Sequence, residues 1–267
     1  MVFYRACLIS IFLTFLLADS CFCAPQSACI ACHRPHNLCK GDCVSCHRGD
    51  DRTRRKEIAH HDLVAGRFAH YQIEGSQVVE RGKELLDSLA CRRCHIYAEK
   101  GNRMAGSLDL TGATGKARDI HASIREPVLF MPNFHLSDTQ IASLVNAILA
   151  RARFINPPGG ETPLVVHFQD LSNMQKNVFA LQCGKCHKTL SEKSGGLGNG
   201  DVAPNLSGLF SEFYPRTYRD TKSWNPDNLK KWLDNPRDVR TNAVMQPVRL
   251  TQEEFQQLLE LIHTDKF

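Results

Sequence analysis

Cysteine and histidine recur in this chain in one fixed spacing, Cys-x-x-Cys-His, which appears four times. Two thiols separated by two residues can add to the two vinyl groups of one porphyrin, and the histidine that follows is then held as a proximal iron ligand. The pattern therefore predicts covalent haem attachment at four places. The cysteines are Cys29 and Cys32, Cys43 and Cys46, Cys91 and Cys94, and Cys183 and Cys186, and the proximal histidines are His33, His47, His95 and His187.

Structural zinc is the competing interpretation, because pairs of cysteines also build tetrahedral zinc sites. Zinc sites of that kind combine cysteine pairs in fours, and they give no reason for a histidine after every pair. The four motifs use eight of the twelve cysteines of the chain. Haem is therefore favoured, and the colour of the purified protein would discriminate between the two.

The N-terminus of this 267-residue chain carries an export pattern. Arg5 precedes an apolar run from Ala6 to Ala18, and small residues follow. The run is shorter than the roughly 20 residues that cross a bilayer, so it predicts a secretory signal peptide over residues 1–23. We expect an exported protein, in the periplasm or an equivalent compartment. An uncleaved anchor, or a lipid on Cys21, is the alternative and would be its link to a membrane.

The formal net charge of +5 does not indicate a nucleic-acid partner. The propionates of four haems would offset it, so the holoprotein is expected to be close to neutral. No other segment of the sequence is long and apolar enough to span a membrane.

Two stretches after Tyr71 repeat one plan. In each, apolar residues at helical spacing lead into the third or fourth motif. Next come a loop, then a stretch that ends in proline, and then a methionine. Six residues after the methionine, a capping box begins an amphipathic helix. Repetition of this kind predicts two domains. The paired features are the stretches 78–90 and 174–182, the loops 109–112 and 205–208, Met131 and Met245, and the boxes that begin at Ser137 and Thr251.

This plan resembles the class I cytochrome c domain, over residues 76–153 and 169–266. In that family a methionine loop supplies the second iron ligand, and Met131-Pro132 and Met245-Gln-Pro247 match its position. The resemblance implies that Met131 and Met245 bind iron, although methionine more often only packs a core. Pro204-Asn-Leu206 matches the loop whose proline carbonyl orients the proximal histidine, and the first copy has Leu108 in that place.

The segment 24–72 has two motifs and no methionine. A segment of this length is too small for an ordinary core, so we expect two haems to organise it, with little regular structure. It holds four further imidazoles, which favour a second histidine on each iron. His60, in a stretch that looks like the distal-ligand helix of small multihaem cytochromes, and His36 are the favoured distal ligands. The other two are His61 and His70.

The chain as a whole thus resembles a tetrahaem c-type cytochrome of all-α fold. The expected parts are a signal peptide at 1–23, a dihaem segment at 24–72, a class I cytochrome c domain at 76–155 and a second one at 168–267. The expected cofactors are four covalently bound haem c groups.

An electron carrier is the function that this ligation predicts. If every iron has two protein ligands, no position is open for a substrate, and we expect no catalytic residue. By analogy the donor would be a quinol-oxidising respiratory complex and the partners redox proteins, with Arg92 and Arg93 at an exposed haem edge. The alternatives are a multihaem enzyme of peroxidase or thiosulfate-oxidising type, and a fixed cytochrome subunit of a respiratory complex.

Overall fold

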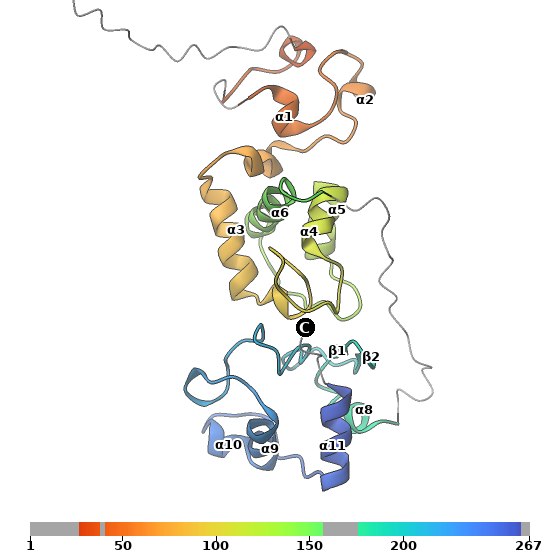
Figure 1. Ribbon diagram of the computed structural model, residues 1–267, viewed down its shortest axis with the longest axis vertical. Helices are drawn as coiled ribbons and strands as arrows, with labels where there is room; N and C mark the ends of the chain where they lie inside the picture. The colour runs from red at the N-terminus through yellow and green to blue at the C-terminus, as the bar shows by residue number, and fades with distance from the viewer. Residues whose placement is uncertain (1–26, 38–40, 157–175, 263–267) are drawn as a thin grey trace, which may run out of the picture.

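The computed structural model of the protein describes residues 27–37, 41–156 and 176–262. Three parts follow one another along its long axis: an N-terminal segment, a helical domain and a second helical domain (Figure 1). The expected signal peptide, Cys21, Cys39, His167, His263 and most of the connection between the repeats lie outside the described residues. Among those described, no helix has the length and apolar character needed to cross a membrane.

The N-terminal segment consists of short helical turns joined by loops. None of residues 27–37 and 41–63 is buried, so this part of the chain has no apolar core of its own. The Asp42 side chain accepts a hydrogen bond of 2.8 Å from the amide of Ser45 and thereby begins the helix that carries the second motif. The elements are η1 (Ala28–Ala31), α1 (Cys43–His47), α2 (Lys56–Ala59) and η2 (Gly66–Gln72).

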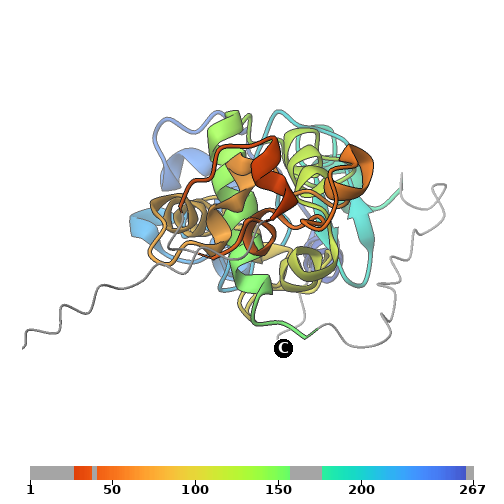
Figure 2. The same ribbon diagram turned by 90° about the horizontal axis from the view of Figure 1, so that it is seen from above.

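The end of this segment packs on the next domain. Val64, Phe68 and Tyr71 are buried, and they share a core with α6 (Asp138–Ala152). Asn146 of α6 donates a hydrogen bond of 2.8 Å to the carbonyl of Arg67. Seen from above, the N-terminal segment accordingly lies over the helical domain (Figure 2). The sequence predicts that the N-terminal segment ends at residue 72. In the structure, the last residues of that segment belong to the core of the next domain.

The middle domain is built on two crossed helices. A Cβ atom at Gly82 of α3 (Gln77–Ser88) would collide with the carbonyl of Ser143 of α6, so glycine permits this close crossing. The capping box at Ser137 is confirmed, because its hydroxyl accepts from the amide of Gln140 and the Gln140 side chain accepts from the amide of Ser137. The other elements are η3 (Cys91–Arg93), α4 (Leu108–Thr114) and α5 (Ala117–Arg125).

The second helical domain repeats the pairing of its first and last helices, α8 (Val178–Gln182) and α11 (Gln252–Leu261). Phe179 and Phe255 lie in its core, and the predicted capping box at Thr251 is again present. The remaining elements are β1 (Thr189–Ser191), β2 (Gly195–Leu197), η4 (Arg219–Thr221), α9 (Pro226–Asp234) and α10 (Pro236–Val239).

The all-α prediction holds in outline, since nearly all the regular secondary structure of the described residues is helical. It missed one two-stranded antiparallel sheet, in which Leu190 of β1 pairs with Gly196 of β2. It also treated the two loops of the repeat as equivalent. The first of them forms helix α4, which Ser107 caps, whereas its counterpart at 205–208 lies in extended chain and a turn.

Candidate haem sites

Three of the four motif histidines have one ring nitrogen engaged by the main chain. A carbonyl oxygen can only accept, so Nδ1 carries the proton in each case and the lone pair is on Nε2. Metal-binding histidines are held in this way, with Nε2 turned to the metal. The pairs are His47 with Val64 at 3.0 Å, His95 with Gly106 at 2.7 Å and His187 with Pro204 at 2.7 Å.

The carbonyl that orients His95 does not come from Leu108, the residue that takes the place of Pro204 in the first copy of the repeat. Pro204 orients His187 as the resemblance implied, but its counterpart Leu108 is the first residue of α4. The carbonyl of Gly106, two residues earlier, bonds His95 instead. Helix α4 stands where the second domain has a loop. The carbonyl that accepts from His95 is therefore that of Gly106, the residue directly before the helix cap Ser107.

The motif cysteines lie in surroundings that suit a haem. None of these eight cysteines forms a disulfide with another described residue. Burial raises the pKa of Cys91 and of Cys183 to about 11 in each case, and it also raises the pKa of Cys94. Such apolar surroundings keep the thiols protonated and match the apolar faces and vinyl edge of a porphyrin. Among the described residues, no group of three or more His, Cys, Asp or Glu side chains could by itself hold a metal ion.

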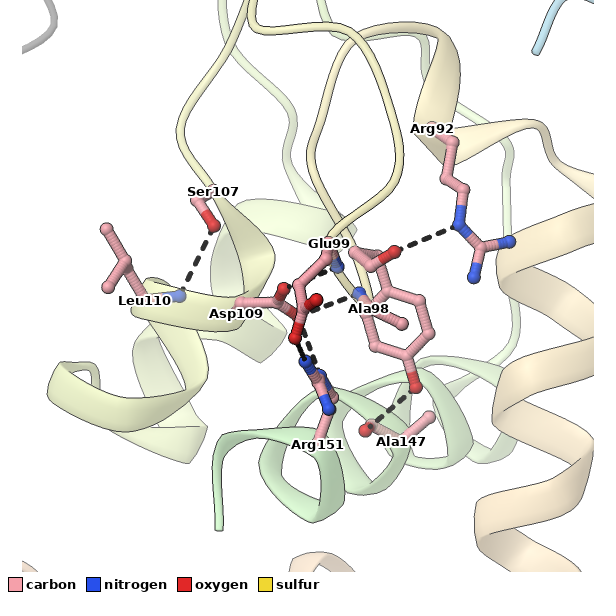
Figure 3. Close-up of polar contacts among 9 residues, drawn as sticks. Arg92, Ala98, Glu99, Ser107, Asp109, Leu110, Ala147 and Arg151 are labelled. Carbon is pink, nitrogen blue, oxygen red and sulfur yellow. Dashed lines mark hydrogen bonds and ion pairs between the residues drawn. The ribbon is translucent and has the colours of Figure 1, made fainter. Parts of the chain in front are cut away.

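The third motif is fixed to its domain by a buried carboxylate that sequence reasoning missed. Asp109 of α4 is 4% exposed and accepts hydrogen bonds from the amides of Ala98 and Glu99, at 2.9 and 3.0 Å. Arg151 of α6 lies beside it, with Nε 3.6 Å from Oδ1 (Figure 3). The loop that leaves the motif is therefore tied to two helices. A single aspartate in the sequence gave no signal for this role.

The tyrosine that follows the same motif extends this support. The hydroxyl of Tyr97 donates to the carbonyl of Ala147 in α6, at 3.3 Å. Arg92 donates through Nε to the carbonyl of Tyr97, at 3.1 Å, and pairs with Asp87. Figure 3 shows Arg92 directed toward this loop of its own domain.

The first two motifs face a single cavity of about 610 Å³. Their cysteines approach one another, because the side chains of Cys29 and Cys43 lie side by side. Apolar residues of the wall include Val64 and Ile73. Because both motifs line one continuous cavity, haems attached at the two motifs would lie next to each other.

Histidines occur in pairs across this cavity. The ring of His33 faces that of His60, with centroids 5.9 Å apart, and the ring of His47 faces that of His36, with centroids 5.7 Å apart. All four rings line the cavity. The structure thus brings each motif histidine together with one of the two distal ligands that the sequence favoured.

The other histidines take different positions. The side chain of His61 is 77% exposed and lies 3.4 Å from Asp62, whereas His70 lines the cavity without facing a motif histidine among the ring pairs described. His121 is buried against Phe68, and His135 is exposed.

Met245 lies in a polar contact that the sequence did not predict. The indole Nε1 of Trp232 donates to its sulfur at 3.0 Å. The rings of Trp224 and Trp232 are 5.7 Å apart, so Trp224 packs beside this contact. Met131 is half-buried at the end of the turn that Val128 begins, while Met104 is the buried methionine of that domain.

The expectation that Arg92 and Arg93 both face an external partner is wrong for Arg93. Its side chain is 8% exposed and contacts the second helical domain. The sequence pattern could not reveal this, because the contacting residues lie more than a hundred positions away.

Two family models match the chain. Residues 77–146 match the family of cytochrome c oxidase, cbb3-type, subunit III, and residues 176–266 match the cytochrome c family. No curated protein and no solved structure matches it. The two matched regions contain the third and fourth motifs, and together they support a c-type cytochrome that transfers electrons through covalently bound haem.

Proposed function

We propose that this chain, whose two helical domains are of cytochrome c type, is an exported tetrahaem cytochrome that transfers single electrons between redox proteins. Its haem c groups would be attached at the four motifs, and each supplies, when bound, one iron that changes between the ferrous and ferric states. The ligand pairs would be His33 with His60, His47 with His36, His95 with Met131, and His187 with Met245.

The facing imidazoles of the N-terminal segment are the observation that supports this proposal most. Imidazole nitrogens bind first-row metals at about 2 Å, so two rings on opposite faces of one iron have centroids roughly 6 Å apart. The separations of 5.9 and 5.7 Å agree with that value. Rotation about the shared axis leaves the angle between the ring planes free, so the angles of 55° and 74° are both compatible with it.

The ligand types give the electron transfer a direction. Histidine as the second ligand lowers the potential of a haem, whereas methionine raises it. Electrons would therefore enter at the N-terminal haem pair and leave from the methionine-ligated sites. With two protein ligands on every iron, the chain has no open coordination position, which favours a carrier over an enzyme. A quinol-oxidising respiratory complex remains our candidate donor.

A fixed subunit of a respiratory complex is the second candidate. The match of residues 77–146 to subunit III of a cbb3-type oxidase favours it. The haem chemistry would be the same, and only the partner would differ. Purification from membranes in a stable complex with an oxidase or a quinol-oxidising enzyme would decide for the subunit, and recovery of the chain alone for the carrier.

Haem content is the first test of the proposal. We expect the pyridine haemochrome assay to give four haems per chain, all retained in denatured protein in mass spectrometry because thioether bonds hold them. A content of two or fewer would contradict the assignment of the N-terminal segment, and a colourless protein that binds zinc would contradict all four sites.

The methionine ligands are tested by exchange for histidine. Met131→His and Met245→His should each lower one midpoint potential by on the order of 0.1 V, a part of the range of about 0.8 V that axial ligands span. The charge-transfer band of iron–thioether bonding should weaken by one site in each variant. Met104→Leu is the control and should keep that band. Unchanged potentials in both histidine variants would show that the methionines only pack the core.

A further inference from the structure

The two cytochrome c-type domains meet at the third attachment motif. Arg93, between Cys91 and Cys94, donates through Nη1 to the carbonyl of Asn205 at 3.1 Å. Its guanidinium carbon lies 5.7 Å from the ring centroid of Tyr214, whose hydroxyl donates to the same carbonyl at 3.1 Å. A buried arginine with these partners is a fixed contact between domains, and it removes this part of the motif from solvent.

The segment from Asn205 to Ser207 also reaches both sides of the third site. The Asn205 amide nitrogen donates to the carbonyl of Phe130, the residue before Met131, at 2.9 Å. Its amide oxygen accepts from the main chain of Ser207 at 2.9 Å, and the Ser207 side chain lies beside Cys94. One segment of the second domain thus touches the attachment motif and the methionine loop of the first.

Two glycines make this approach feasible. A Cβ atom at Gly196 of β2 would collide with the ring of Phe130. Gly208 has a φ of +69°, and a Cβ atom there would lie 2.8 Å from the carbonyl of Arg93. The surface of the second domain is therefore shaped to receive the edge of the first.

The same segment is bonded to the proximal ligand of the fourth site. Pro204, directly before Asn205, accepts the hydrogen bond of 2.7 Å from Nδ1 of His187. Four consecutive residues therefore connect a haem-attaching cysteine of the third motif, Cys94, with the iron-binding histidine of the fourth.

We propose that residues 204–207 form an electron-transfer junction, in which Arg93 and Asn205 hold the third haem site against the proximal side of the fourth. The inference rests on the proposed function. One electron would pass across the junction, so that a ferrous third site becomes ferric and a ferric fourth site becomes ferrous. No covalent bond forms or breaks. The N-terminal haem pair supplies the electron, and a redox protein that docks at the fourth site removes it.

The test is electron transfer within the haem-loaded full chain. A short light pulse with a flavin photoreductant adds less than one electron per molecule, and absorbance then follows its redistribution. The relevant phase has a rate that does not depend on protein concentration, and it disappears when Cys183→Ala and Cys186→Ala remove the fourth attachment site.

We expect the double variant Arg93→Met with Asn205→Asp to slow this phase by about tenfold. The variant loses one charged and one neutral hydrogen bond between the domains, so a smaller fraction of the molecules would hold the two sites docked. Asn205→Asp keeps the acceptor for Ser207, removes the donor to Phe130 and adds one negative charge. Arg92→Glu is the matched control, because it lowers the charge of the same motif by two, as the double variant does, and the partners of the Arg92 side chain, Asp87 and Tyr97, lie in the first domain. A change of rate that is caused only by a shift in the difference between the two midpoint potentials would therefore appear in the control as well.

Gly196→Leu tests the junction by a second route, because it forces the ring of Phe130 away without altering a charge. Slowing in both the double variant and Gly196→Leu would support the junction. The inference is overturned if the parent lacks the phase, or if both variants keep the parent rate. A haem count below four would instead defeat the proposed function, so the two failures are distinguishable.

Discussion

Replacing His60 with alanine is expected to open one of the four irons. His60 is the imidazole that faces His33 across the N-terminal cavity. Without it the first site would have a single protein ligand, and its iron would change from low spin to high spin. Electron paramagnetic resonance should show this change for about a quarter of the haem, and carbon monoxide should bind the reduced variant but not the parent.

His61→Ala is the matched control for this experiment. It removes the same side chain one position later, yet His61 is exposed and paired with Asp62. The control should keep all four irons low spin and should not bind carbon monoxide. Carbon monoxide binding by His61→Ala but not by His60→Ala would transfer the ligand role to His61.

Removing the four N-terminal attachment cysteines is expected to unfold most of the first segment. With Cys29, Cys32, Cys43 and Cys46 replaced by alanine, residues 27–63 would lose the two haems that fill their cavity. No residue in the described part of that range is buried, so the chain has no apolar core to keep it ordered. Hydrogen exchange there should approach the rate of an unfolded chain, while α3 and α6 stay protected.

Val64, Phe68 and Tyr71 mark where this unfolding should stop. They pack in the core that includes α6, so residues 64–72 should remain ordered. The control is Cys183→Ala with Cys186→Ala, which removes one haem from the second domain and should leave the N-terminal segment protected. Parent-like protection of residues 27–63 in the quadruple variant would show that this segment folds without haem.

Local signals allowed much of the structure to be predicted. The two capping boxes, at Ser137 and Thr251, begin helices where expected, because a capping box involves only neighbouring residues. The attachment motifs are likewise local, since two thiols and an imidazole within five residues define the chemistry. The spare histidines, together with the absence of methionine in that segment, pointed to histidine as the second ligand, and the resemblance of the stretch around His60 to a distal-ligand helix favoured that residue.

Tertiary structure decided which residues meet. His33 faces His60 and His47 faces His36, a pairing that four equivalent imidazoles in a sequence cannot specify. The carbonyl that orients His95 comes from Gly106, because a helix stands where the repeat predicted a loop.

The burial of Arg93 is the clearest case of a property that the sequence could not give. Its partner Asn205 lies in the other domain, and the contact depends on how two separately folded bodies dock. Residue spacing encodes the pattern within one helix or motif, whereas the docking of domains depends on the shapes and hydrogen-bonding groups of whole surfaces. For that reason the sequence by itself determined the four Cys-x-x-Cys-His motifs and predicted the helical repeat, and only the tertiary structure showed the contact between the third motif and the second helical domain.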